Sequence, residues 1–214
     1  LKRRMSASSR LRGRRGFTVG LPSPLYAQKD TVERKSGRSG EMAFVTLAHR
    51  YRDDQGVLLD EEHDIVYREA PSAEEKATLA ELGARARAGE HVFERTGLHQ
   101  QRVVADSVLM FRYSAATFNG HRIHYDADYC REVEAYPGLV VHGPLIATLL
   151  LGYAENTLMP GRTIRTFTFR AKRPTFAIGA FHLHAAPVVD GCAMEVWSTN
   201  NVGEVGLDAR VAFE

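Results

Sequence analysis

Two histidines three residues apart, His121 and His124, lie in a polar segment just ahead of the most apolar run of the chain. A histidine near its ordinary pKa can take a proton from water and return one to carbon at neutral pH. The ring needs an orienting neighbour, and Asn119, Tyr125 and Asp126 are the local candidates. These residue types therefore indicate acid–base chemistry.

The same spacing also invites a metal site. His142, Cys130 and Asp126 are close enough in sequence to complete a zinc ligand set with the histidine pair. However, a histidine pair in a loop, with no second paired ligand cluster, is a loose pattern that arises by chance. We therefore expect no metal in this segment.

Small residues mark the start of the apolar run, at Pro137-Gly138 and at His142-Gly143-Pro144. The first N–H groups of a helix have no partner within the helix and lie at the positive end of its dipole. They can stabilise a developing oxyanion, and a glycine lets a substrate carbonyl approach the backbone. Alternatively, Gly138 and Gly143 only allow a sheet to pack tightly on the helix. The residues alone leave both interpretations open.

The apolar run, residues 138–154, contains His142, Pro144 and Gly152, and it is short for a membrane span. It therefore predicts a core helix, which Met159-Pro160-Gly161 ends. A surface helix is predicted after Ser72, which is expected to be its N-cap. His182 and His184 share a strand face, and we expect them at the surface or rim of the protein.

β-Forming composition and turn signals predict strands on both sides of the core helix. The clearest strands are residues 42–51 and 57–67, joined by Asp53-Asp-Gln-Gly56, and residues 163–170, 180–189, 192–199 and 206–213. Weaker β character lies within residues 16–35 and at 108–113, and the remaining turns are predicted at 37–40, 190–191 and 200–201. One apolar helix against a curved antiparallel sheet is an α+β architecture.

Charge is unevenly distributed along the 214 residues, although the formal net charge is only +2. The first 29 residues hold eight Lys or Arg and no acid, so the remainder carries −6. An acidic body argues against a general nucleic-acid binder. Cys130 and Cys192 cannot form a disulfide framework, and a reducing compartment is the simplest inference. No secretory signal follows the basic start.

The basic start itself has three interpretations. Because the chain begins at Leu1, it can be a fragment of a longer protein. An Arg- and Ser-rich beginning without acids also has the composition of an organellar transit peptide. The third interpretation is a solvated, twisted edge strand of the sheet.

Two long motifs carry a family resemblance. N-G-H-R-I-H-Y-D at residues 119–126, followed by Y-P-G-L-V-V-H-G-P-L at 136–145, resembles the MaoC-like hot-dog hydratases and dehydratases. The most similar branch is that of mesaconyl-CoA hydratase and the mitochondrial type 2 3-hydroxyacyl-thioester dehydratases. K-S-G-R-S-G, F-V-T-L-A-H-R-Y and E-E-H-D-I-V-Y-R-E, within residues 35–69, resemble the later strands of that branch's first repeat. This resemblance favours truncation over a transit peptide.

The resemblance implies a double hot-dog fold, in which a curved antiparallel sheet wraps a long central helix. Residues 1–70 would be a truncated N-terminal repeat, 71–105 a linker with a surface helix, and 106–214 the catalytic C-terminal repeat. The implied reaction adds water to an enoyl thioester or removes it, most closely on a mesaconyl-CoA-type short branched or dicarboxylic acyl-CoA.

The resemblance also implies roles for single residues. His124 matches the catalytic histidine, and Gly143 matches the glycine whose N–H binds the thioester oxygen. The usual Asp five residues before that histidine is Asn119 here, which has no proton to exchange but can position water. Asp126 would then support His124. Apart from the resemblance, the residues at the helix start keep Gly138 as a second candidate for binding the thioester oxygen. The site is expected to need no metal.

Basic residues after the helix could meet the phosphates of coenzyme A or of a carrier arm, or they could be solvated strand ends. They are Arg162, Arg165, Lys172 and Arg173. We expect no cofactor beyond coenzyme A as part of the substrate, and acyl-CoA or acyl-carrier thioesters, not nucleic acid or membrane, as partners. A homo-oligomer is compatible with this picture. A cytoplasmic protein is expected, with a mitochondrial one as the alternative. A hot-dog thioesterase and a non-catalytic acyl-CoA-binding subunit are the rival functions.

Overall fold

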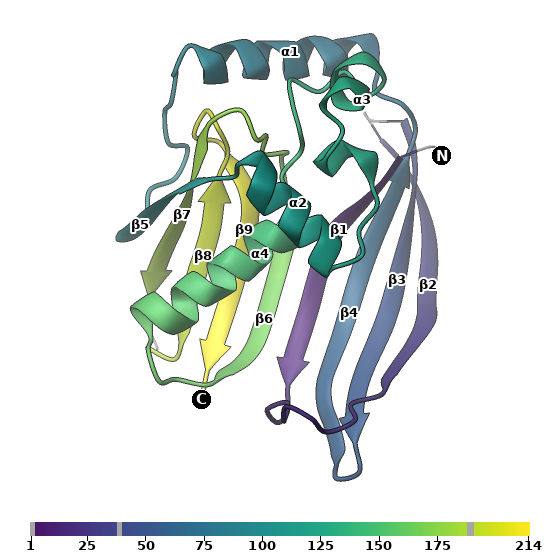
Figure 1. The fold of residues 1–214 in the computed structure, drawn as a ribbon, viewed down its shortest axis with the longest axis vertical. Helices are drawn as coiled ribbons and strands as arrows, with labels where there is room; N and C mark the ends of the chain where they lie inside the picture. Colours follow the sequence, from purple (N-terminus) through teal and green to yellow (C-terminus); the bar gives the residue numbers. More distant parts are fainter. Residues whose placement is uncertain (1–2, 38–39, 188–190) are drawn as a thin grey trace.

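A computed structural model describes residues 3–37, 40–187 and 191–214. Its main element is a nine-stranded antiparallel sheet in the order β2-β3-β4-β1-β6-β9-β8-β7-β5 (Figure 1). The N-terminal half comprises β1 (Arg3–Gly13), β2 (Leu25–Gly37), β3 (Gly40–Asp53) and β4 (Gly56–Arg68). The C-terminal half comprises β5 (His99–Val104), β6 (Ile164–Ala171), β7 (Ala180–Pro187), β8 (Ala193–Thr199) and β9 (Val205–Phe213).

The predicted core helix is α4 (Gly143–Gly152), which continues as the π-helical turn η2 (Tyr153–Leu158). It lies across the C-terminal half of the sheet (Figure 1). Leu145, Ile146 and Leu150 of α4 share one buried cluster with alternate residues of β7, such as Phe181 and Leu183. Side chains alternate between the two faces of a strand, so one face of β7 covers the helix. The α+β architecture is confirmed.

The basic start forms β1, so the strand interpretation of these residues is confirmed. However, β1 is not an edge strand: it pairs with β4 on one side and β6 on the other and joins the two halves of the sheet. Arg10 of β1 meets Glu62 and Asp64 of β4. Arg3 is buried and pairs with Glu134. Two of the basic residues of β1, Arg3 and Arg10, are therefore matched by acids elsewhere in the fold.

The remaining helices are α1 (Ala73–Arg87), α2 (Ser107–Ala116), the 3-10 turn η1 (Arg122–His124) and α3 (Ala127–Glu132). The α1 helix confirms the prediction after Ser72, with a capping box between Ser72 and Glu75. The strand predicted at 108–113 is wrong, because these residues belong to α2. Asp106 accepts the Leu109 N–H at 2.8 Å and caps that helix, a signal that outweighs β-like composition.

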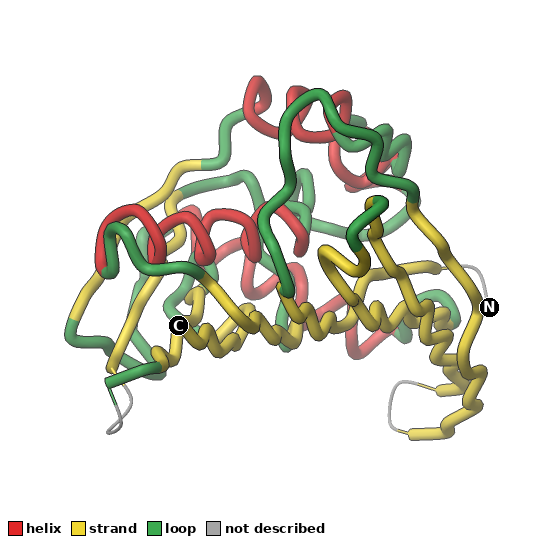
Figure 2. Tube along the Cα trace, turned by 90° about the horizontal axis from the view of Figure 1, so that it is seen from below, coloured by secondary structure: helices red, strands yellow, loops and turns green. Residues whose placement is uncertain are grey.

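The predicted strands 42–51, 57–67, 163–170, 180–189, 192–199 and 206–213 correspond to β3, β4, β6, β7, β8 and β9. Residues 38–39 and 188–190 of the predicted segments lie outside the described residues, although Gly37 and Gly40 are paired. The linker predicted at 71–105 also holds the edge strand β5 (Figure 2). Among the described residues, no helix is long and apolar enough to cross a membrane.

The prediction for His184 is wrong, because its side chain is fully buried. His184 stacks on Trp197 at a ring separation of 5.4 Å and contacts Phe93 of the segment before β5. That segment crosses the face of the sheet opposite α4 and is hydrogen-bonded to residues near β9 through Val92 and Glu94. The covering segment lacks helix or strand periodicity, which explains why it could not be predicted.

Candidate active site

The motif loop between α2 and α3 is shaped by its own polar residues. Phe118 adopts a left-handed conformation with φ of 52° where α2 ends. The Asn119 side-chain oxygen then accepts the His121 N–H at 3.1 Å, which bends the chain toward η1. Asp126 caps α3 by accepting the Tyr129 N–H at 2.9 Å. The loop therefore presents His124, at the end of η1, in a defined orientation.

His124 is held in one tautomer. Its Nδ1 lies 2.7 Å from the Val140 carbonyl oxygen, which can only accept, so Nδ1 carries the proton. The unshared pair is then on Nε2. Burial lowers the pKa of His124 to about 4, which keeps the ring neutral near pH 7. A neutral imidazole with a free Nε2 pair is the form that acts as a general base.

A second imidazole supports His124. The His142 ring stacks on the His124 ring with 3.7 Å between centroids and 16° between planes. His142 is fully buried, and its Nε2 lies 2.8 Å from the Ser114 hydroxyl. Burial lowers the pKa of His142 to about 3, so it adds no charge beside His124. Ser114 lies in α2, and no sequence signal connects it to this site.

The start of α4 lies directly after this ring stack. His142 is the N-cap residue and makes no side-chain capping bond. Within the described part of the chain, the N–H groups of Gly143 and Leu145 at the helix start therefore keep no hydrogen-bond partner. A Cβ placed on Gly143 would meet no atom within 4 Å. Packing within the chain therefore does not require a glycine here, and the open space can admit a substrate carbonyl.

Gly138 has a different environment. A Cβ at this position would lie 2.5 Å from Cγ2 of Ile178, so the glycine permits close packing of the loop. This observation favours the packing interpretation for Gly138 and the ligand interpretation for Gly143. The structure thus separates two glycines that the sequence left equivalent.

Asp126 is committed to neighbours other than His124. Its Oδ1 accepts from Tyr129 N–H, and its Oδ2 pairs with Arg122 at 2.7 Å. The Tyr129 N–H and the Arg122 guanidinium lower the pKa of Asp126 below its ordinary value. Among the described residues, no hydrogen bond joins Asp126 to His124. The structure thus brings His124, His142 and Gly143 together, while Asp126 stabilises the loop from outside.

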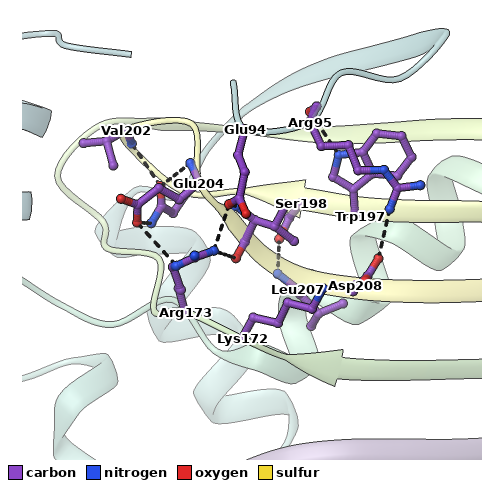
Figure 3. Close-up of polar contacts among 12 residues, drawn as sticks. Glu94, Arg95, Lys172, Arg173, Trp197, Ser198, Val202, Glu204, Leu207 and Asp208 are labelled. Carbon is purple, nitrogen blue, oxygen red and sulfur yellow. Dashed lines mark hydrogen bonds and ion pairs between the residues drawn. The ribbon is translucent and has the colours of Figure 1, made fainter. Parts of the chain in front are cut away.

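The four basic residues after the helix all have partners of their own. Arg162 donates to the Glu214 carbonyl oxygen at 2.8 Å, and Arg165 pairs with the Glu214 side chain at 3.3 Å. Lys172 binds Asp208 at 2.7 Å, and Arg173 binds Glu94 at 2.8 Å (Figure 3). A phosphate at these positions would compete with carboxylates already in place, and a coenzyme A site here stays a prediction.

Cys130 is buried, and its thiol lies 3.1 Å from the Ile123 carbonyl oxygen. Burial raises the pKa of this thiol to about 11, so it is not a nucleophile at neutral pH. Cys192 is exposed, and neither cysteine forms a disulfide. Neither cysteine thus adds a thiolate to the candidate site, and the catalytic role of His124 stays a prediction.

Known proteins resemble this chain in sequence over most of its length. The family profile described as hydroxyacyl-thioester dehydratase type 2 matches residues 1–177. Mesaconyl-C(4)-CoA hydratase of Chloroflexus aurantiacus is 39% identical over 209 residues, which are 98% of this chain and 70% of that protein. The mitochondrial type 2 hydroxyacyl-thioester dehydratase of Schizosaccharomyces pombe is 40% identical over 70 residues, 32% of this chain and 23% of that protein.

Solved structures give the same fold at low sequence identity. HtdX from Mycobacterium tuberculosis superposes with a TM-score of 0.71 at 15% identity, covering 98% of this chain and 76% of that one. A MaoC-like dehydratase from Phytophthora capsici superposes with a TM-score of 0.69 at 10% identity, covering 99% of this chain and 72% of that one. The hot-dog fold is thereby confirmed.

Fold and sequence matches together define the class of this protein: a hot-dog enzyme of the acyl-CoA hydratase and dehydratase group. The chain belongs to the family of type 2 hydroxyacyl-thioester dehydratases.

Proposed function

We propose that this protein hydrates an enoyl thioester reversibly, with His124 as the acid–base residue and the Gly143 N–H as the donor to the thioester oxygen. The observation that carries the proposal is the proximity of the two groups. The His124 ring, neutral and with Nε2 free, stacks on the residue that immediately precedes Gly143 at an uncapped helix start. Base and oxyanion donor are thus held on one rigid unit.

In the hydration direction, Nε2 of His124 takes a proton from water while the oxygen of that water bonds to the β-carbon. The π electrons of the carbon–carbon double bond shift toward the thioester carbonyl, and the Gly143 N–H stabilises the resulting enolate oxygen. The His124 imidazolium then returns the proton to the α-carbon, which restores the neutral ring. Atoms and charge balance, and no other reactant is required.

Asn119 and Asp126 have secondary roles in this proposal. Asn119 uses its oxygen to hold the loop, which leaves its amide N–H groups to bind the attacking water. Asp126 acts by capping α3 and by pairing with Arg122, and not through contact with His124. Gly138 lets the loop pack closely.

We further propose a mesaconyl-CoA-type substrate, a short branched or dicarboxylic acyl-CoA. The support is the identity of 39% with the Chloroflexus aurantiacus hydratase over 98% of this chain. A panel of enoyl-CoA thioesters, including mesaconyl-CoA and straight-chain crotonyl-CoA, tests the reaction and the substrate class. The expected result is a 3-hydroxyacyl or equivalent hydrated product, formed fastest from the branched dicarboxylic thioester.

The same assay distinguishes the rival functions. Release of free thiol without a hydrated thioester would identify a thioesterase. Thioester binding without turnover of any panel member would identify a non-catalytic binding subunit. Faster hydration of straight-chain than of branched thioesters would retain the reaction but overturn the proposed substrate class.

A further inference from the structure

Two imidazoles and a carboxylate converge on β3 and β4, outside the candidate active site. His49 of β3 is paired directly with Glu61 of β4, and His63 lies two residues further along β4. Residues two apart on a strand point to the same face, and paired residues share a face. One ligand atom from each of the three side chains lies within 4.8 Å of those of the other two.

This group faces the same side of the sheet as α4. Glu61 is paired with Leu11 of β1, and Leu11 packs against the core cluster around α4. The group therefore lies on the inner face of the N-terminal half. It shares no residue with the His124, His142 and Gly143 unit.

Two serines of β1 orient the ligand atoms. Ser9 is only 1% exposed, and its hydroxyl donates to Oε1 of Glu61. That bond leaves Oε2 directed at His49, whose Nδ1 lies 2.9 Å away. The Ser6 hydroxyl lies 2.8 Å from Nε2 of His63. Outer hydrogen bonds of this kind fix ring orientation in metal sites.

The protonation states also suit a cation. Burial lowers the pKa of His63, which favours the neutral imidazole that a metal ion requires. Nδ1 of His49 and Oε2 of Glu61 already face one another, and a metal ion between them can bond to both atoms. Two neutral imidazoles and one carboxylate neutralise only one of the two positive charges of a divalent ion. Metal sites with three protein ligands leave a fourth position open for water.

We propose that His49, Glu61 and His63 form a binding site for one divalent transition-metal ion of the zinc class. Nitrogen-rich sites select zinc, copper, nickel and cobalt over magnesium and calcium, which prefer oxygen ligands. Ligand atoms around a tetrahedral zinc ion lie about 3.4 Å apart, so small side-chain rotations close the site. A bound ion would tie β3 to β4 on the inner face of the sheet.

Titration of the metal-free chain with Co²⁺ and Zn²⁺ tests this site. Co²⁺ in a tetrahedral site with nitrogen ligands gives visible d–d bands, and we expect one ion per chain, displaced by Zn²⁺. His49→Ala and His63→Ala should each abolish the bands, and Ser9→Ala should weaken binding by roughly tenfold. His99→Ala is the matched control, because His99 is an exposed histidine on the edge strand β5, and it should leave binding unchanged.

Far-UV circular dichroism of each variant establishes that loss of binding is not loss of folding. For the unaltered chain, Zn²⁺ should raise the melting temperature, and it should not do so for His63→Ala. Absence of Co²⁺ bands in the unaltered chain would overturn the proposal. Bands that persist in both His49→Ala and His63→Ala but vanish in His121→Ala would also overturn it, since the ion would then lie at the motif loop.

Discussion

At the scale of single residues, the site depends on protonation states that the fold imposes. The Val140 carbonyl oxygen fixes the His124 tautomer, and burial keeps both His124 and His142 neutral. A base of low pKa is intrinsically weak, but it is present in its active form across the whole neutral range. In the proposed mechanism the Gly143 N–H would compensate by stabilising the enolate, which reduces the basicity that His124 needs.

The rate should therefore show an unusual pH dependence. In the proposed mechanism His124 acts in its neutral form, which is lost as pH falls through its pKa of about 4. We expect kcat/KM for hydration to show no decrease from histidine protonation between pH 5 and 7. Well below pH 4 it should decline about tenfold per pH unit. Short assays, with circular dichroism at each pH, make the measurement. A limb near the ordinary histidine pKa of about 6.5 would contradict the buried, neutral ring.

Asn119 offers a paired test of water positioning. Asn119→Ala removes both the loop hydrogen bond to His121 N–H and the amide donor, so kcat should fall by roughly a hundredfold. Asn119→Asp keeps the oxygen acceptor and restores the acid usual in related motifs, so it should retain most activity. Activity in Asn119→Ala equal to that of the unaltered chain would remove Asn119 from the mechanism.

At the scale of elements, the two glycines near the start of α4, Gly143 and Gly138, allow a proposed functional role to be tested separately from a packing role. Gly143→Ala adds a methyl group where no atom of this chain lies within 4 Å. The melting temperature should not decrease, because alanine is favoured over glycine in helices. kcat/KM should nevertheless fall at least tenfold, because the methyl group occupies the space proposed for the thioester. Full activity of Gly143→Ala would contradict the role of this position.

Gly138→Ala provides the matched comparison. Its methyl group would meet Ile178 at 2.5 Å, so this variant should be destabilised by about 1–3 kcal/mol. Urea unfolding of both variants makes the comparison. Gly138→Ala should lose stability and Gly143→Ala should lose activity, and the reverse pattern would invalidate both assignments.

Secondary-structure elements were predicted best where the hydrophobic pattern and the turn residues indicated the same element. Val57 to Tyr67 and its Asp-Asp-Gln-Gly turn formed a strand and hairpin as expected. At α2, Val108, Met110 and Phe111 have β-like composition, while a single capping residue, Asp106, determines the helix. Motif resemblance located His124 and Gly143. The Ser114–His142 bond was not predictable, because it joins residues 28 apart through tertiary packing alone.

At the scale of the whole molecule, several histidines are buried in neutral form on opposite faces of the sheet. Burial lowers the pKa of His184 to about 4, much as it does for His124. Above pH 6.5 these rings are neutral in both the folded and the unfolded chain. Below pH 6.5 the unfolded chain binds protons that the folded chain excludes. The free energy of unfolding therefore decreases as the pH is lowered.

This linkage predicts acid lability between about pH 6.5 and 4. One histidine shifted from 6.5 to about 4 costs roughly 3 kcal/mol over that window. Urea unfolding at several pH values measures the loss. His184→Gln should reduce its steepness, while His99→Ala, which changes an exposed ring, should not. A free energy of unfolding that stays constant from pH 7 to 5 would contradict neutral burial of these rings.

The catalytic role of His124 is tested by comparing hydration rates of the unaltered chain, His124→Ala and His99→Ala with the best enoyl-CoA of the panel. General acid–base catalysis typically contributes about 10²–10⁴-fold, so His124→Ala should lose at least a hundredfold in kcat. Its far-UV spectrum and thioester affinity should be retained, and His99→Ala should match the unaltered chain. Equal kcat in His124→Ala and the unaltered chain would contradict the assignment of His124 as the acid–base residue.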